Sequence, residues 1–266
     1  MDNKIIFENI NIHTDFINEW VKNIGVSSEY TTHWFIDDLP YDIKNKINII
    51  INANKIKSIF YSKFKFFFRV KPVYCMNELY VSINNSTKNN SDKVFFKPHI
   101  DGPFGFFPFC SVYRTLIGCN DNNFIITHFP LKNKEYNITK NDLLAFDYNK
   151  EIHYITFKKD NHLKSTKRIV LKLHYVVYPI GFDILAYILS YFCESYNTIA
   201  RYAFLKTLQP KTKKDKLINS TILFITDNWI YTEKYIGFKN IAYLTSIYLF
   251  YFLYNLWNFF NIINYL

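Results

Sequence analysis

Short apolar runs separated by polar turn clusters occupy the middle of the chain and restrict what it can fold into. Between residues 72 and 179 the runs are rich in Val, Ile, Tyr and Phe, and the stretches between them are rich in Asn, Asp, Gly and Lys. The runs are ELYVSI, KVFFKPHI, SVYRTLIGC, NFIITHF, LLAFDY, IHYITF and RIVLKLHYVVY. Runs of this length and composition, bounded by turn residues, are typical of β-strands. The pattern predicts an antiparallel barrel or sandwich.

Helical patterns flank this β segment and give the chain an α+β, mainly β, organisation. In DFINEWVKNIG, apolar residues recur at helical spacing up to Gly25, and YDIKNKINIIINANKIKSIFYSKF repeats the pattern. After Pro179, FDILAYILSYFCESYNTIARYAFL is largely apolar and helical in pattern. We therefore expect an N-terminal helical region (1–71), a β core (72–179) and an apolar C-terminal helical region (180–266).

The last 26 residues suit two different environments. Residues 241–266 contain no Asp, Glu, Lys or Arg, and a helix needs about 20 apolar residues to span a bilayer. The same stretch carries Asn255, Asn258, Asn261 and Asn264, whose amides are costly in hydrocarbon unless they are hydrogen-bonded. A membrane anchor and a buried helix both remain open. We expect the protein in the cytoplasm, or attached to a membrane through its C-terminus.

Charge and cysteine content argue against two classes of function. The net charge is +10, but the lysines are dispersed and no run of five basic residues occurs, so a nucleic-acid partner is not supported. The four cysteines form no CxxC pair, so a zinc ribbon is not indicated.

A histidine and a carboxylate lie one residue apart in KPHIDG, at residues 97–102. His99 and Asp101 project from the same face if this segment is extended. Alone, they could be a simple hydrogen-bonded pair. The strand-like runs downstream offer three further histidines: His128, His153 and His174. His153 is preferred as a third ligand because it opens IHYITF directly after DLLAFDYN. Two histidines and one carboxylate occupy three octahedral positions and leave three open, as in non-haem Fe(II) oxygenases.

A cation in the last strand-like run would serve a 2-oxoglutarate co-substrate, whose distal carboxylate needs a buried positive charge. Arg168 begins RIVLKLHYVVY, and Lys172 follows on the same face of the predicted strand. An arginine fork binds a carboxylate through two hydrogen bonds. Considered alone, Arg168 would be a surface charge at a strand edge. In sequence order after the three ligands, it favours a co-substrate role, with Lys164, Lys167 and Lys172 as alternatives.

With these pieces in order, residues 72–179 resemble the Fe(II)/2-oxoglutarate-dependent dioxygenases, most closely the prolyl 4-hydroxylase-like branch. The matching segments are HID (99–101), RTLIGCND (114–121), THFP (127–130), LLAFDYNKEIH (143–153) and RIVLKLHYVVY (168–178). Two departures stand out. The Gly-Gly-Glu that usually precedes Thr-x-Phe-Pro is replaced by NNFII, and the loop between His153 and Arg168 is longer than usual.

The resemblance implies a double-stranded β-helix, the jelly-roll or cupin-like fold, flanked by N- and C-terminal helices. It also implies that His99, Asp101 and His153 are the catalytic iron ligands. Arg168, or nearby Lys172, would then bind 2-oxoglutarate. The implied activity is that of a hydroxylase using Fe(II), 2-oxoglutarate and O2. A protein side chain is the substrate that this branch favours, and a lipid or another small molecule is the alternative.

Other features of the β segment have simpler interpretations. His174 shares a strand face with Arg168 and Lys172, and a hydrogen-bonded core histidine is the preferred interpretation. The loop DGPFGFFPF, residues 101–109, is consistent with the lining of a barrel mouth or with an ordinary hydrophobic loop. The competing hypothesis for the whole chain is a non-catalytic jelly-roll binding protein, or a membrane-associated structural protein, in which the histidines and the aspartate are incidental.

Overall fold

The computed structural model of the protein describes residues 4–26, 32–64, 67–83, 97–121, 124–158, 167–208 and 212–218, together with 220, 221 and 224.

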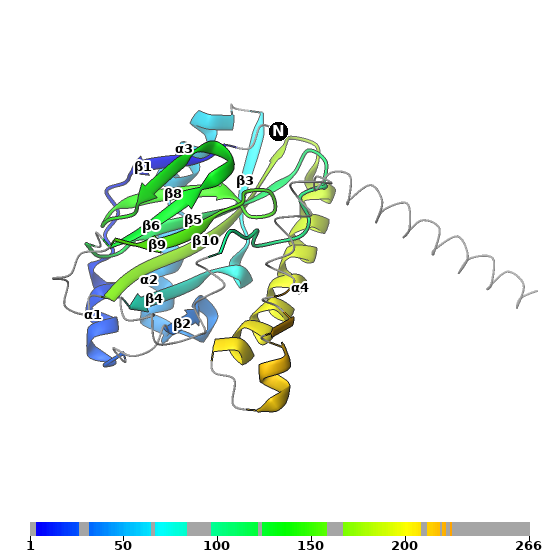
Figure 1. The fold of residues 1–266 in the computed structure, drawn as a ribbon. Helices are drawn as coiled ribbons and strands as arrows, with labels where there is room; N and C mark the ends of the chain where they lie inside the picture. The colour runs from blue at the N-terminus through cyan, green and yellow to red at the C-terminus, as the bar shows by residue number, and fades with distance from the viewer. Residues whose placement is uncertain are drawn as a thin grey trace, which may run out of the picture.

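Two antiparallel sheets form the centre of this described part of the chain (Figure 1). The larger sheet contains seven strands: β1 (Ile6–Asn9), β2 (Thr32–Phe35), β3 (Phe68–Pro72), β4 (Glu78–Ile83), β5 (Ser111–Gly118), β8 (Asp142–Asp147) and β10 (Lys167–Pro179). Their order is β1–β8–β5–β10–β4–β2, and β3 also pairs with β10. The smaller sheet has the order β7–β6–β9, with bounds β6 (Ile125–Phe129), β7 (Lys134–Asn137) and β9 (Tyr154–Phe157).

The chain passes back and forth between the two sheets as a double-stranded β-helix. After β4 in the large sheet, His99 forms an antiparallel bridge with His153 beside β9. The chain returns to the large sheet as β5, crosses to β6 and β7, returns as β8, crosses to β9 and returns as β10. The large-sheet row β4–β10–β5–β8 thus faces a second row formed by the His99 segment, β9, β6 and β7. The predicted jelly roll flanked by helices is confirmed.

Side-chain alternation gives the large sheet two different faces. Along β10, one set of alternate residues joins the apolar core beneath the N-terminal helices: Ile169, Leu171, Leu173, Tyr175 and Val177. Val170 lies on the opposite face and packs in a separate cluster with Phe129 of the small sheet. Arg168, Lys172 and His174 share the face of Val170 because side chains alternate along a strand. The predicted cations therefore lie between the two sheets.

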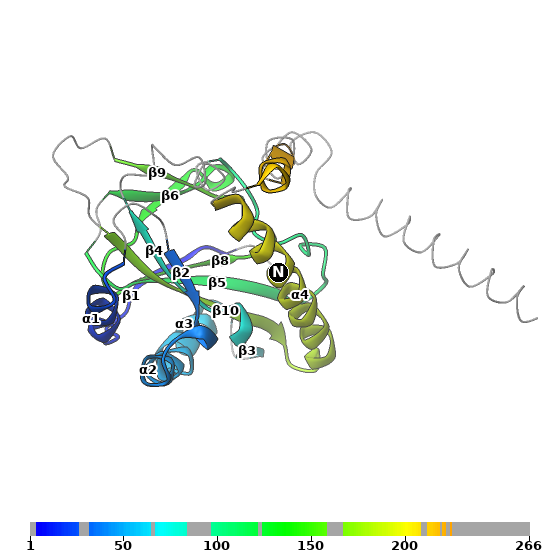
Figure 2. The same ribbon diagram turned by 90° about the horizontal axis from the view of Figure 1, so that it is seen from below.

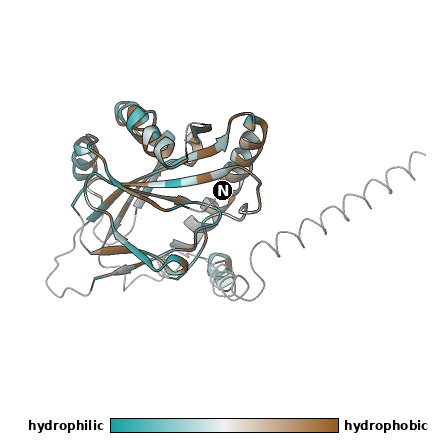
Figure 3. Cartoon of the chain, turned by 90° about the horizontal axis from the view of Figure 1, so that it is seen from above, coloured by the Kyte–Doolittle hydropathy of each residue, from teal (hydrophilic) through white to brown (hydrophobic). Residues whose placement is uncertain are grey.

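Three helices cover the outer face of the large sheet, opposite the small sheet (Figure 2). They are α1 (Asp15–Asn23), α2 (Tyr41–Ile51) and α3 (Asn54–Phe64). Each buries an apolar stripe, for example Ile17 and Val21 of α1 and Phe60 of α3. Hydrophobic and hydrophilic colours alternate along the helices in Figure 3, as expected for amphipathic helices.

The N-terminal region also supplies strands that its sequence pattern does not predict. β1, β2 and β3 join the large sheet alongside the three helices. β1 and β2 contain four residues each and β3 contains five, which is too short for a clear period-2 pattern. They are stabilised by pairing with strands far away in the sequence, such as Ile6 with Ala145 of β8.

Helix α4 (Asp183–Leu208) follows β10 and packs across one end of the two sheets (Figures 1 and 2). Ala186, Leu189 and Cys193 are buried there against residues that include Val176 and Tyr178. No helix within the described residues is both long and apolar enough to cross a membrane. The predicted anchor or buried helix at residues 241–266 lies outside the described residues.

Candidate metal centre

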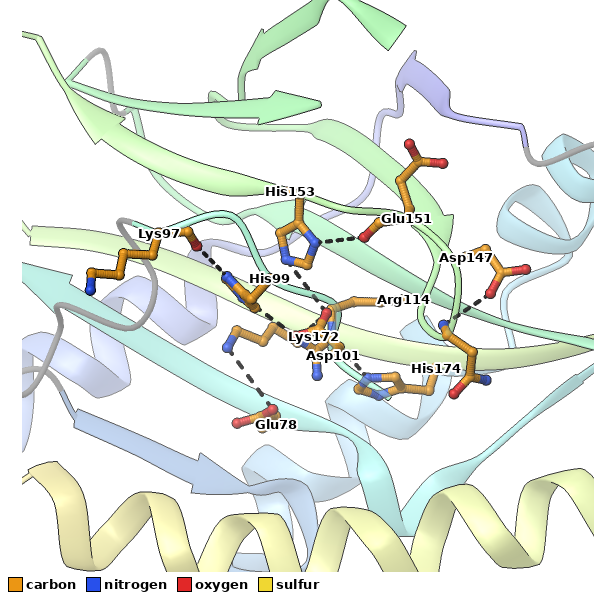
Figure 4. Close-up of polar contacts among 11 residues, drawn as sticks. Glu78, Lys97, His99, Asp101, Arg114, Asp147, Glu151, His153, Lys172 and His174 are labelled. Carbon is orange, nitrogen blue, oxygen red and sulfur yellow. Dashed lines mark hydrogen bonds and ion pairs between the residues drawn. The ribbon is translucent and has the colours of Figure 1, made fainter. Parts of the chain in front are cut away.

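Two histidines and an aspartate converge between the two sheets (Figure 4). Asp101 Oδ1 lies 3.8 Å from His99 Nε2, and Asp101 Oδ2 lies 3.5 Å from His153 Nε2. One potential ligand atom from each residue lies within 4.8 Å of the other two. Their side chains expose only 11% (His99), 9% (Asp101) and 9% (His153). Most of the water is therefore excluded from this cluster.

The backbone aligns the two imidazoles directly. His99 N–H donates to the His153 carbonyl oxygen, and His153 N–H donates to the His99 carbonyl oxygen, both at 3.0 Å. This exchanged pair places the two residues opposite each other on adjacent extended segments. The ring centroids are 4.5 Å apart as a result.

Carbonyl oxygens fix which nitrogen of each imidazole faces Asp101. His99 Nδ1 lies 2.8 Å from the Lys97 carbonyl oxygen, and His153 Nδ1 lies 3.1 Å from that of Glu151. A carbonyl oxygen only accepts, so each Nδ1 carries the proton and Nε2 offers its lone pair. The Glu151 carboxylate is itself held by Lys132 at 2.8 Å. The two carbonyl oxygens bonded to Nδ1 orient the imidazoles so that Nε2 can bind a metal.

The protonation states of the cluster suit a cation. Burial lowers the pKa of both imidazoles, that of His153 to about 4, so both rings are neutral near pH 7. Burial opposes ionisation of Asp101, but Arg114 and the two histidines hold the pKa of this carboxyl well below its usual range. Two neutral nitrogen donors and one carboxylate can hold a divalent first-row metal on one face of an octahedron.

Two further cations line the space between the sheets. Arg168 is 5% exposed, and within the described part of the chain its Nε and Nη2 atoms make no hydrogen bond. Burial lowers its pKa to about 10. Lys172 Nζ lies 4.0 Å from Glu78 Oε1 and 3.8 Å from the centroid of the Tyr80 ring. Burial lowers the pKa of Lys172 to about 8.

The other candidate cations differ in position. Lys167 directs its ammonium to the carbonyl oxygen of Val26, which follows α1 on the helix-covered side. It therefore points away from Arg168 and the cluster. Lys164 lies outside the described residues.

Arg114 is a residue of the cluster to which the sequence assigned no role. Its Nη1 atom forms an ion pair with Asp101 Oδ2 at 2.7 Å, and its Nε atom donates a hydrogen bond to His174 Nε2 at 3.1 Å. His174 is thus a buried, hydrogen-bonded histidine, the interpretation preferred from its sequence position, and it contacts the cluster through Arg114. A charged residue inside the apolar run SVYRTLIGC was the signal available, because a buried arginine requires an acceptor.

The loop after Asp101 connects the cluster to α4. Gly102 N–H donates to the Tyr148 carbonyl oxygen at 3.0 Å. Phe104 then stacks on Phe192 of α4, with centroids 5.7 Å apart, and meets Tyr196 edge-on at 5.9 Å. The loop DGPFGFFPF therefore forms an aromatic contact between the donor cluster and α4.

No protein-family model matches the chain, and no curated protein sequence matches it. Its structure is similar to solved structures of prolyl hydroxylases and 2-oxoglutarate-dependent oxygenases. A viral collagen prolyl hydroxylase from Paramecium bursaria Chlorella virus-1, in its 2-oxoglutarate complex, is 11% identical with a TM-score of 0.39, over 65% of this chain and 95% of that one.

Two further similar structures come from a eukaryote and a bacterium. A prolyl 4-hydroxylase structure from Phytophthora capsici is 9% identical with a TM-score of 0.46, over 89% of this chain and 84% of that one. HygX from Streptomyces hygroscopicus, with nickel and 2-oxoglutarate bound, is 8% identical with a TM-score of 0.44, over 68% of this chain and 84% of that one. The fold is assigned from its strand order and the site from its geometry.

Proposed function

We propose that the chain is an Fe(II)- and 2-oxoglutarate-dependent dioxygenase of the prolyl 4-hydroxylase-like branch that hydroxylates a substrate. The observation that carries the proposal is the convergence of His99, Asp101 and His153 between the two sheets. Both rings are neutral, both direct Nε2 toward the carboxylate, and the carboxylate is ionised.

In this proposal the three residues are the ligands of Fe(II). They would hold the ion through three donors and leave room for the co-substrate and O2. When bound, iron supplies the oxidative chemistry, with 2-oxoglutarate as the source of electrons. The protein holds the donors in place through the His99–His153 backbone pair and through the carbonyl oxygens behind each ring, and it excludes water from the site by burial.

Arg168 is proposed to bind the distal carboxylate of 2-oxoglutarate. Its guanidinium is buried on the inner face of β10, and two of its nitrogen atoms lack hydrogen bonds within the described residues. A buried charge without such partners is costly, and a carboxylate ligand would offset this cost. Lys172 is the second candidate, but its ammonium is directed to Glu78 and Tyr80.

The substrate is proposed to be a protein side chain, with a small molecule or a lipid as the alternative. The resemblance to the prolyl 4-hydroxylase-like branch supports the first choice. Membrane attachment through residues 241–266 stays a prediction from the sequence.

Metal analysis of anaerobically purified protein tests the proposal. We expect one Fe(II) or Mn(II) per chain, and loss of that metal in His99→Ala and Asp101→Ala. His128→Ala is the matched control, because His128 pairs with Thr156 and Glu135, away from the cluster. The loaded protein should also release succinate from 2-oxoglutarate. A chain that binds no metal, or binds it equally well without Asp101, would instead be the non-catalytic jelly-roll protein.

A further inference from the structure

Arg114 lies in the centre of β5 and is held from three directions. It is 8% exposed and projects between the sheets. Its Nη1 atom contacts Asp101 Oδ2 at 2.7 Å, and its Nε atom contacts His174 Nε2 at 3.1 Å. The centre of its guanidinium lies 4.9 Å from the centroid of the Tyr148 ring. Figure 4 shows Arg114 between Asp101 and His174, and with the Tyr148 ring these contacts leave the guanidinium little freedom to rotate.

The partners of Arg114 are fixed by the sheet and by packing. His174 is opposite Arg114 in the register of β10 and β5. The His174 backbone N–H donates to Asn77 Oδ1 at 2.7 Å, and its ring meets the Tyr148 ring edge-on at 5.5 Å. Because His174 Nε2 accepts from Arg114, this ring is neutral and acts only as an acceptor on that side. His174 therefore orients the arginine and does not compete for the carboxylate.

We propose that Arg114 is a positioning residue that restricts Asp101 to a single metal-binding oxygen. This inference rests on the metal centre proposed above. An aspartate can bind a cation through one oxygen or through both. Nη1 of Arg114 holds Oδ2 in a short contact between opposite charges. Turning Oδ2 toward the metal together with Oδ1 would lengthen this short contact, so the ion pair favours binding through Oδ1 alone.

The consequence concerns the number of open coordination positions. Two histidines and a one-oxygen aspartate leave three positions on an octahedral ion, whereas a two-oxygen aspartate leaves two. A co-substrate that binds through two atoms, together with O2, needs three. Lys172 does not take the place of Arg114 in holding Asp101 Oδ2, because its ammonium is directed to Glu78 and Tyr80.

The number of water molecules on bound Mn(II) tests this role without any turnover. Mn(II) is added to the metal-free protein, and its exchangeable waters are counted by electron–nuclear double resonance in 17O-labelled water. We expect three waters in the wild type and two in Arg114→Met. Arg114→Lys keeps a charged donor for Asp101 and should restore three.

Two controls test whether the variants still fold: thermal unfolding of each variant, and a second replacement. The double variant Arg114→Met with His174→Phe removes the donor and its acceptor together, so no buried acceptor is left unpaired at position 174. It should also hold two waters. Three waters in the methionine variants, or two in the wild type, would overturn the role of Arg114 while leaving the metal centre intact. A wild type that binds no Mn(II) would overturn the metal centre and this inference with it.

Discussion

Replacing Gly102 by alanine should damage the metal centre more than the stability of the fold. A Cβ atom at this position would lie 2.3 Å from Tyr148 Cε1 and 2.4 Å from Asn149 Oδ1. Ordinary contacts begin near 3.4 Å, so the shortfall to the ring atom is about 1.1 Å. Gly102 cannot easily retreat, since its N–H is bonded to the Tyr148 carbonyl oxygen and Phe104 N–H is bonded to Asn149 Oδ1.

The strain should pass to both neighbours of the new methyl group. Asp101 precedes Gly102 directly, and the Tyr148 ring lies beneath Arg114, which holds Asp101. Overpacking of this kind costs about 1–3 kcal/mol of unfolding free energy. A displacement of about 1 Å at a reacting centre costs roughly 100-fold in rate. We therefore expect Gly102→Ala to lower 2-oxoglutarate turnover by about two orders of magnitude.

The assays are succinate release, Mn(II) affinity and urea denaturation. Gly25→Ala is the matched control: Gly25 has φ +62° and nothing within 4 Å of the added Cβ. That variant should lose about 1 kcal/mol of stability through backbone strain and keep its metal affinity and turnover. If Gly102→Ala turns over like the wild type, the close packing of Asp101 against Tyr148 is not what sets the donor geometry.

Two further predictions concern the cations and the pH dependence. Arg168→Met should weaken 2-oxoglutarate binding to the Mn(II)-loaded protein roughly 10–100-fold, the equivalent of about 1.5–3 kcal/mol for a charged hydrogen bond. Lys172→Met should weaken this binding less. Calorimetry measures both affinities, and the reverse ranking would assign the carboxylate to Lys172. Between pH 7 and pH 5 the metal-free protein should lose about 2 kcal/mol of unfolding free energy through His153, because the unfolded imidazole gains its proton near pH 6.5 while the folded one has a pKa of about 4. Urea denaturation at both pH values checks this, and a His153→Asn variant with an unchanged pH slope would contradict it.

Much of the β core could be predicted from sequence because its strands lie within apolar runs that are bounded by turn residues. SVYRTLIGC and RIVLKLHYVVY became β5 and β10, and alternation alone placed Lys172 on the face of Arg168. The N-terminal strands could not be predicted in the same way. β1 owes its conformation to pairing with β8, more than 130 residues away, and four residues carry too little pattern to indicate this.

The contact between Arg114 and Asp101 could not be predicted from sequence for a related reason. The spacing within His-x-Asp is local, so a shared face for His99 and Asp101 follows from strand geometry. Arg114 and His174 become neighbours only through the register of β5 against β10, which sequence alone leaves open. A buried charge shows that a partner is required, but only the register shows which partner it is.

The exchanged backbone bonds between His99 and His153 link metal binding to correct assembly of the fold. A slip of one residue on either side would turn one imidazole to the outer face of its segment. A misregistered molecule would therefore lack a donor, and a metal ion would discriminate against it. Because the cation would bind only molecules in which His99 and His153 are paired in the native register, it would stabilise those molecules over misregistered ones during folding.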